Sequence, residues 1–251
     1  MTRPIAVQLY SLREALQQDF EGTLEGVAKA GYVGVEMAGL YGRTPEVVAK
    51  LLQVLNLQVV AMHCKVLSPE ELAASLAEAQ ALNCPNLVCP WVTPDTFSTL
   101  EGIHELAEKL NTATESIEAQ GRKLLYHNHD FELQLVNDEP ALNHFVKALD
   151  ARVGIELDTY WVKVGGIDPV AMLNQLGDRV GLLHVKDGHI EPTHPMVAVG
   201  DGKLDYAPII AALPDSVEWL IVELDACATD MIEAVTKSAH YLIEKGLGHG
   251  R

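Results

Sequence analysis

Short runs of almost uninterrupted apolar residues alternate along the chain with longer segments in which apolar residues recur every three or four positions. Such runs are typical of strands buried on both faces, and the longer segments are typical of amphipathic helices. Eight strands are predicted, at 5–10, 33–38, 58–64, 86–91, 123–128, 153–158, 180–185 and 219–224. The alternation continues without a linker, which predicts an α/β fold: a single (β/α)8 TIM barrel domain over residues 1–251.

Residues typical of helix starts and helix ends support this pattern. Pro follows a capping residue at Thr44-Pro45, Ser68-Pro69 and Asp168-Pro169, which predicts three helix starts. Gly31, Gly121 and Gly246 stand where helices are expected to end in a left-handed residue.

Charge and composition exclude several classes of protein. With 18 Lys+Arg against 35 Asp+Glu, the net charge of −17 argues against nucleic acid as a partner, because gripping a phosphate backbone needs a basic stripe. The sequence contains no apolar run of the roughly 18 residues that a membrane helix needs, so no membrane association is expected. Cys64, Cys84, Cys89 and Cys227 form no CxxC pair, which predicts reduced, buried thiols and a cytoplasmic protein.

Four predicted strands end in side chains that can bind a metal or move a proton. The segments are LLYHNHDFE at 124–132, VGIELDTYW at 153–161, VGLLHVKDG at 180–188 and WLIVELDAC at 219–227, and the side chains are His127, Asp158, His184 and Glu223. Parallel strands of a barrel bring these ends to one face, its C-terminal face, where active sites lie. Nitrogen and oxygen ligands together predict one divalent ion, Mn²⁺ or Zn²⁺, with Co²⁺, Fe²⁺ or Mg²⁺ as alternatives.

Strand alternation extends this set of inward side chains. If His127 faces the barrel axis, Leu125 and His129 do so too, and His184 brings Leu182 and Lys186. Further inward candidates are Gln8, Tyr10, Glu36, His63, Glu156 and Ile221. Glu156 lies deeper in its strand and is interpreted as a structural partner within the barrel.

The chain resembles the xylose isomerase-like barrel superfamily, in the group of sugar (phosphate) isomerases and epimerases that also includes inosose dehydratases and, more distantly, endonuclease IV. The motifs are VQLYSLR at 7–13, AGYVGVEMAGLYG at 30–42, YHNHDFE at 126–132, ELDTYWVKVGG at 156–166, LHVKDG at 183–188, VGDGKLDY at 199–206 and IVELD at 221–225. The resemblance implies a metal held by Glu, Asp, His and Glu from the last four strands. Asp158, His184 and Glu223 match that pattern.

The fifth strand departs from it, because His127 stands where the epimerases commonly have a glutamate. The resemblance implies that two glutamates remove and return a proton on opposite faces of the substrate, and here only Glu223 remains. A second acid or base must come from Glu132, His129, Lys186 or Glu36, or the reaction needs proton transfer on one side only, as in a syn elimination. Trp161 stands where multi-metal relatives carry a DxxH histidine, which disfavours a three-zinc phosphodiesterase site.

The expected roles follow from this chemistry. Glu223, Lys186 and Glu132 are predicted to be catalytic, because proton abstraction beside a metal-chelated carbonyl needs a carboxylate and a donor to the anionic oxygen. The residues predicted to bind substrate are Tyr10, Glu36, His63, His129 and Trp161. The glycine turn at 199–205 could bind a substrate phosphate or simply lead into a helix.

Three functions remain open. The first is a metal-dependent isomerase or epimerase acting on a ketose, keto-sugar or polyol derivative. The second is a dehydratase or other lyase acting on an inosose or 3-keto-glycoside, suggested by the missing glutamate. The third is a barrel that binds a sugar without turnover. The exact substrate, its phosphorylation and the oligomeric state, including a possible homo-oligomer, are not determined by the sequence.

Overall fold

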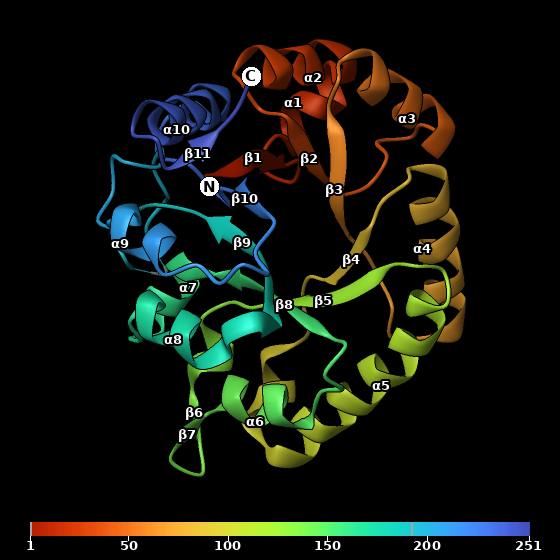
Figure 1. The fold of residues 1–251 in the computed structure, drawn as a ribbon, viewed down its shortest axis with the longest axis vertical. Coiled ribbons are helices and arrows are strands. Elements are labelled where there is room, and N and C mark those ends of the chain that lie inside the picture. Colours follow the sequence, from red (N-terminus) through yellow and green to blue (C-terminus); the bar gives the residue numbers. More distant parts are fainter. Residues whose placement is uncertain (1, 192) are drawn as a thin grey trace.

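Eight parallel strands close into a barrel with helices around it (Figure 1). The computed structural model describes residues 2–191 and 193–251. The barrel strands in order are β1 (Arg3–Gln8), β2 (Gly34–Met37), β3 (Gln58–His63), β4 (Asn86–Cys89), β5 (Lys123–His127), β8 (Gly154–Asp158), β9 (Val180–Val185) and β10 (Trp219–Val222). The ring closes because Ile5, Ala6 and Val7 of β1 pair with residues 220–222 of β10.

The helices that follow the strands cover the outside of the barrel (Figure 1). They are α1 (Arg13–Gln18), α2 (Phe20–Lys29), α3 (Pro45–Val54), α4 (Pro69–Ala81), α5 (Leu100–Glu118), α6 (Ala141–Ala148), α7 (Thr159–Val164), α8 (Pro169–Leu176), α9 (Tyr206–Ala211) and α10 (Met231–Glu244). Short 3-10 turns are η1 (Pro94–Ser98), η2 (Phe131–Leu133) and η3 (Gly177–Arg179). Two small additions are the hairpin β6 (Leu135–Val136) and β7 (Glu139–Pro140), and β11 (Gly248–His249), which pairs with the start of β1.

The predicted barrel is confirmed, with shifts at strand ends. All eight expected strands are present, but β1 ends at Gln8, so Tyr10 belongs to the loop that follows. The three Pro-marked helix starts are confirmed; the hydroxyl of Ser68 accepts from the Glu71 amide and the carboxylate of Asp168 from the Val170 amide. Gly31, Gly121 and Gly246 have positive φ just beyond helix ends, as expected. The hairpin β6–β7 and strand β11 were not predicted, because two-residue strands carry no periodic pattern.

Apolar side chains close the barrel interior beneath the polar strand ends. A separate buried cluster contains Ala6, Val60, Ala61, Val88, Leu125, Leu182 and Ile221, with Trp219 packed against it. Leu125, Leu182 and Ile221 are the residues that alternation placed on the same side as His127, His184 and Glu223. Their membership in one cluster, apart from the core that contains Leu124, Leu183 and Leu220, confirms the inward orientation. The polar strand ends therefore lie above an apolar barrel floor.

The cysteine prediction is right for three positions and wrong for one. All four thiols are free; Cys64, Cys84 and Cys89 are buried, but Cys227 is only half-buried because it lies in the loop between β10 and α10. Burial raises the pKa of Cys64 and of Cys89 to about 12, which makes them unreactive core residues. Within the described residues, every helix is too short or too polar to cross a lipid bilayer.

Gly34 is required by the packing of the barrel floor. A Cβ at this position would lie 2.6 Å from Val60 Cγ1 and 2.9 Å from Trp219 Cζ3. Gly34→Ala should therefore lower the free energy of unfolding by roughly 1–3 kcal/mol through overpacking. Gly26→Ala is the control, because nothing lies within 4 Å of a Cβ there and helix propensity should raise stability by about 0.5–1 kcal/mol. Urea denaturation measures both; equal effects would contradict the packing argument.

Candidate active site

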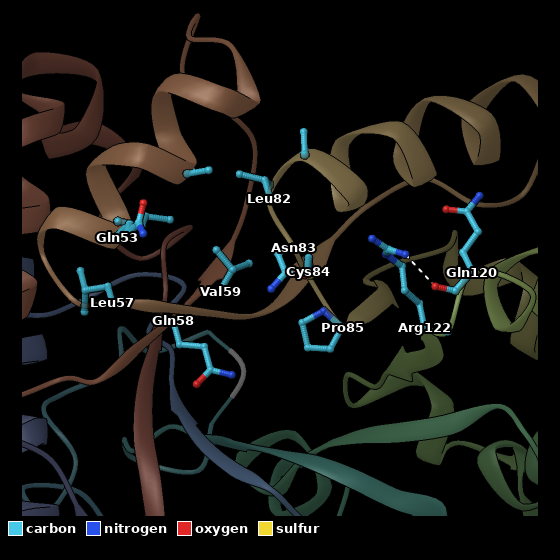
Figure 2. Close-up of a pocket in the computed structure, with 14 residues that line it drawn as sticks. Gln53, Leu57, Gln58, Val59, Leu82, Asn83, Cys84, Pro85, Gln120 and Arg122 are labelled. Carbon is cyan, nitrogen blue, oxygen red and sulfur yellow. Dashed lines mark hydrogen bonds between the residues drawn. The ribbon is translucent and has the colours of Figure 1, made fainter.

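A cavity of about 410 Å³ opens at the C-terminal ends of the strands. It is lined by Tyr10, Ala38, His63, Pro90, Trp91, His127, His129, Glu223 and Asp225. A larger cavity of about 670 Å³ lies at the other end of the barrel, near Leu57, Pro85 and Arg122 (Figure 2). Among its lining residues there is no histidine or carboxylate, so the smaller cavity is the candidate active site.

The strand ends bring the four predicted ligands together. His127 and Asp158 are the last residues of β5 and β8, His184 is near the end of β9, and Glu223 directly follows β10. One ligand atom from each of the four lies within 4.8 Å of the other three, and all four side chains are buried. Asn128, directly after β5, joins the ends of β5 and β8, because its side-chain oxygen accepts from the Asp158 amide at 2.9 Å.

These residues fit a divalent cation. Oδ1 of Asp158 accepts from the Trp161 amide at 2.9 Å, whereas Oδ2 has no hydrogen bond and only an ion-pair contact of 3.0 Å with the Lys186 Nζ. Nδ1 of His127 makes an ion-pair contact of 3.2 Å with Glu156 Oε2, which leaves its Nε2 for a cation. Two nitrogen and two carboxylate donors suit Mn²⁺ or Zn²⁺, and buried polar atoms without partners are rare unless a ligand uses them.

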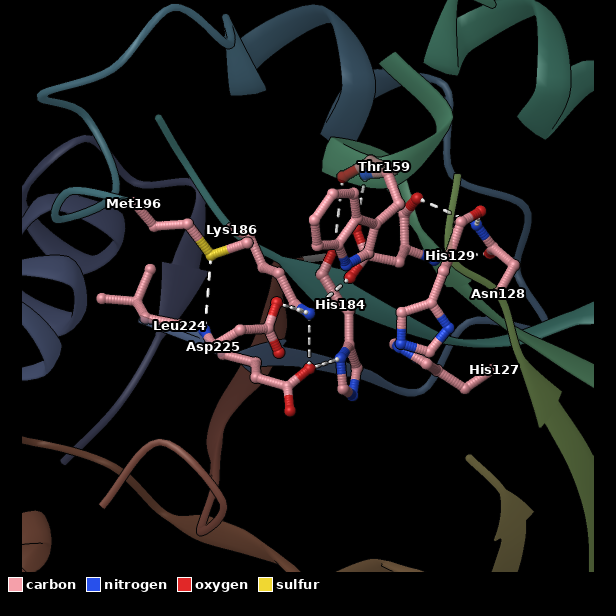
Figure 3. A network of polar contacts seen from close by, with 12 residues as sticks. His127, Asn128, His129, Thr159, His184, Lys186, Met196, Leu224 and Asp225 are labelled. Atoms are coloured by element: carbon pink, nitrogen blue, oxygen red, sulfur yellow. Dashed lines mark hydrogen bonds and ion pairs between the residues drawn. The ribbon is translucent and has the colours of Figure 1, made fainter. Parts of the chain in front are cut away.

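Lys186 lies at the centre of the acidic groups (Figure 3). Its Nζ is 2.7 Å from Glu223 Oε2, 3.0 Å from Asp158 Oδ2 and 2.9 Å from Asp225 Oδ2, and the side chain is fully buried. Burial opposes the charged ammonium, but these three carboxylates raise the pKa of Lys186 well above its usual value. Lys186 is thus a fixed positive charge that holds two of the predicted ligands.

Glu156 anchors three histidines from below. Its Oε2 lies 2.9 Å from His63 Nε2, 3.2 Å from His127 Nδ1 and 3.1 Å from His184 Nε2. A carboxylate that engages one ring nitrogen leaves the other nitrogen free for a metal, as in carboxylate–histidine–metal arrangements. The contacts leave Nε2 of His127 for this purpose. Nδ1 of His184 is hydrogen-bonded to Glu223 Oε2 at 2.9 Å, and a metal held by these two residues would replace that contact.

The electrostatics separate the ionised groups from the neutral ones. Burial alone would lower the pKa of His184, but the charges of Glu156, Glu223 and Glu36 hold it well above its usual value. Burial would raise the pKa of Glu223, yet Lys186 and His184 bring it well below the ordinary value. Burial lowers the pKa of His129 to about 3, with Lys186 contributing, so this imidazole is neutral.

The other residues predicted from the sequence occupy three positions. Tyr10, His63 and His129 line the cavity. Glu36 lies beneath it, fully buried, with Oε2 2.8 Å from His184 Nε2, and burial and Glu156 raise its pKa to about 7. Trp161 is outside the cavity lining, with its ring centre 5.6 Å from Lys186 Nζ.

Glu132 is turned away from the cavity. It is completely buried, its Oε1 accepts from the Tyr126 hydroxyl at 2.7 Å, and its Oε2 accepts from the His129 amide at 2.8 Å. Both oxygens are therefore engaged within the protein, and Glu132 is not among the residues lining the cavity. The geometry favours a role in positioning the loop that carries His129.

Asp225 and Trp91 belong to the site although the sequence did not indicate them, and Glu156 has a larger role than predicted. Asp225 is two residues after Glu223, and strand alternation would have placed both on the same side. It lies beyond the end of β10, where that alternation no longer applies. Trp91 was expected as the last residue of a strand at 86–91, but β4 ends at Cys89, and Trp91 lines the cavity from the loop that follows. Glu156 contacts three histidines from other strands, which no spacing within its own strand could reveal.

The glycine turn at 199–205 is occupied by the protein itself. Oδ2 of Asp187 accepts from the amides of Gly200 and Gly202, and Oδ1 accepts from the amide of Leu204. These amides are the donors that a phosphate would need. The turn is therefore a loop closed by Asp187 and not a free phosphate cradle.

Glu156→Gln should weaken metal binding. An amide holds the histidines less firmly than a carboxylate does, so the affinity for Zn²⁺ or Mn²⁺ should fall by roughly 10–100-fold. Calorimetric titration of the chelator-stripped protein measures it. Glu132→Gln is the matched control, because this buried carboxylate contacts the side chain of none of the four predicted ligands. Unchanged affinity in Glu156→Gln would reject the anchoring role.

Glu132 should make the fold less stable as pH rises. Burial raises the pKa of its carboxyl group from 4.5 to about 8 in the folded protein. The folded state thus holds this proton to higher pH, so stability is lost between about pH 4.5 and pH 8, on the order of 1 kcal/mol for each pH unit. Denaturation in the presence of a chelator should show that the free energy of unfolding of Glu132→Gln rises relative to that of the native protein between about pH 5 and 8.5. A constant difference would contradict this assignment.

Comparisons with known proteins agree with the barrel fold. An inosose dehydratase of Clostridium beijerinckii is 22% identical over 91% of this chain and 90% of its own. A sugar phosphate isomerase/epimerase structure from Parabacteroides distasonis has a TM-score of 0.81 at 23% identity, covering 96% and 94% of the two chains. The IOLI protein with a bound zinc atom has a TM-score of 0.74 at 15% identity over 97% of both chains. Residues 24–245 match the xylose isomerase-like TIM barrel family, and the chain belongs to that family.

Proposed function

We propose that this protein is a metal-dependent lyase of the dehydratase type, which removes water from a keto-polyol or keto-sugar. One observation carries the proposal: the carboxylates among the residues lining the cavity are Glu223 and Asp225 alone. They stand two residues apart at the end of one strand and both contact the same ammonium, Lys186. The carboxylates that could exchange protons with a substrate therefore come from one side.

A single carboxylate is sufficient for a syn elimination. Glu223 takes the proton from the carbon beside the carbonyl, and the electron pair of that bond forms a double bond to the neighbouring carbon. The hydroxyl on that carbon leaves with the proton that Glu223 returns on the same face, so the products are water and an unsaturated ketone. Lys186 and His184 keep Glu223 ionised before the reaction, which is the state a base requires.

The remaining groups bind and orient. His127, Asp158, His184 and Glu223 would hold the divalent ion, which when bound supplies a Lewis acid for the charge that develops on the carbonyl oxygen. Asp225 keeps Lys186 paired from a third side, at 2.9 Å, if Asp158 and Glu223 turn toward a cation. The named activity of the sequence relatives, inosose dehydratase, supports the same reaction class.

An isomerase or epimerase is the second candidate, and His129 is the observation that favours it. This neutral imidazole lines the cavity and follows β5, so it could return a proton on another side. It ranks second because the sequence relatives of this chain are named inosose dehydratases.

Product analysis separates these possibilities. Metal-loaded protein is incubated in D₂O with a panel of inososes and keto-sugars, and the products are followed by mass spectrometry and by absorbance of the unsaturated ketone. A dehydratase loses water, an epimerase gains deuterium without losing water, and a binding protein does neither. Glu223→Gln should lower the rate by roughly 10²–10⁴-fold, because the base is lost. Glu244→Gln on α10 is the control, since this side chain is exposed and far in sequence from the strand end.

A further inference from the structure

Exposed aromatic residues gather at the mouth of the candidate active site. Six large apolar side chains are exposed in the described chain, and the two aromatic ones, Tyr10 and Trp91, are 45% and 53% exposed. Both line the cavity, whereas Val47, Val54, Leu135 and Ile232 do not. Exposed rings concentrated at one cavity are a sign of a binding surface.

Tyr10 is held in place before any ligand arrives. The Arg13 guanidinium lies 4.2 Å from the centre of the Tyr10 ring, and its Nη1 donates to the Tyr10 carbonyl at 2.8 Å. The Tyr10 amide donates to Gln8 Oε1 at 3.1 Å. Arg13 also donates to the Asp225 carbonyl at 3.1 Å, which ties the mouth to the loop after β10. A fixed ring stacks on a ligand with little loss of conformational entropy.

The lining of the cavity is polar at its inner end and aromatic at its mouth. His127 and Glu223 at the inner end are 2% and 3% exposed, and they are the groups that would meet the reacting atoms. A substrate that extends from them to the mouth would present a second part to Tyr10 and Trp91. This second part would meet the two rings and Pro90, surfaces that favour an apolar or aromatic partner.

The charges at the cavity disfavour an anionic substrate. No lysine or arginine is among the residues that line it. Lys186 is buried outside the cavity lining and contacts three carboxylates. The amides of the glycine turn donate to Asp187. A phosphate in the cavity would meet no lysine or arginine among the lining residues and would lie near the Asp225 carboxylate. Arg13 at the mouth is already engaged by the Tyr10 ring and by the carbonyls of Tyr10 and Asp225.

We infer that the substrate is an unphosphorylated keto-sugar joined to an apolar or aromatic group. The sugar ring lies at the polar inner end of the cavity, and the attached group lies between Tyr10 and Trp91. This inference rests on the proposed function for the identity of the sugar part. The stacking on Tyr10 and Trp91 does not depend on any reaction.

Binding of unreactive glycosides tests the inference. Phenyl β-glucoside, methyl β-glucoside and glucose 6-phosphate lack the ketone, so metal-loaded protein should bind them without turnover, as measured by calorimetry. The phenyl glycoside should bind about tenfold more tightly than the methyl glycoside, corresponding to about 1.4 kcal/mol of stacking. Trp91→Ala should reduce that ratio to below about threefold, and Trp91→Phe should restore most of it.

Leu135→Ala is the matched control, because this residue is 69% exposed on β6 and lies outside the cavity lining. Equal affinities for the phenyl and methyl glycosides, absence of binding by the phenyl glycoside, or tighter binding of glucose 6-phosphate would overturn the inference. So would a fall in oligomer mass with Trp91→Ala in sedimentation, since the rings would then serve contact between copies of the chain. A phenyl preference without water loss from any keto-sugar would retain the inference and reject the proposed reaction.

Discussion

The structure of the site depends on the balance of buried charges at the end of the barrel. Glu36, Glu156, Asp158 and Glu223 are all inaccessible or nearly so, and an unpaired carboxylate in such a place is very unfavourable. Lys186 and His184 provide the compensating positive charge through contacts of 2.7–3.1 Å. Glu223 contacts both Lys186 and His184, and Lys186 contacts three carboxylates, so the loss of either cation would leave buried carboxylates uncompensated.

This balance explains why the same residues suit a divalent ion. Asp158 and Glu223 are ionised and face one another across Lys186, and Glu156 draws the histidine rings into fixed orientations. A cation that enters such a group would find the four ligands already close together, and Asp158 and Glu223 would turn toward it from Lys186. The carboxylates among the cavity-lining residues are restricted to the end of β10, and the proposed one-sided elimination rests on that restriction.

The barrel floor and the cavity mouth complete the site. The cluster around Leu125, Leu182 and Ile221 excludes water from below, which strengthens electrostatic interactions among the polar groups above. Tyr10 and Trp91 form the opposite boundary, toward solvent. The candidate active site thus has three layers: the apolar barrel floor, the charged groups above it, and the aromatic rings at the cavity mouth.

The sequence by itself determined the barrel and the four strand-end side chains. Continuous apolar runs, Pro and Gly at helix ends, and the two-residue period of strands are local signals, so they could be read without the structure. They correctly gave the eight strands and brought His127, Asp158, His184 and Glu223 to one face.

Only the tertiary structure decided how these side chains are paired and which of them meet the cavity. Glu132 turns to Tyr126, Glu36 lies under His184, Asp225 binds Lys186, and Asp187 fills the glycine turn. These contacts join residues from different strands and loops, and their direction depends on rotamers, register shifts and loop paths. Periodicity fixes the side of a strand on which a residue lies, but not its partner across the barrel, because that partner is set by closure of the sheet.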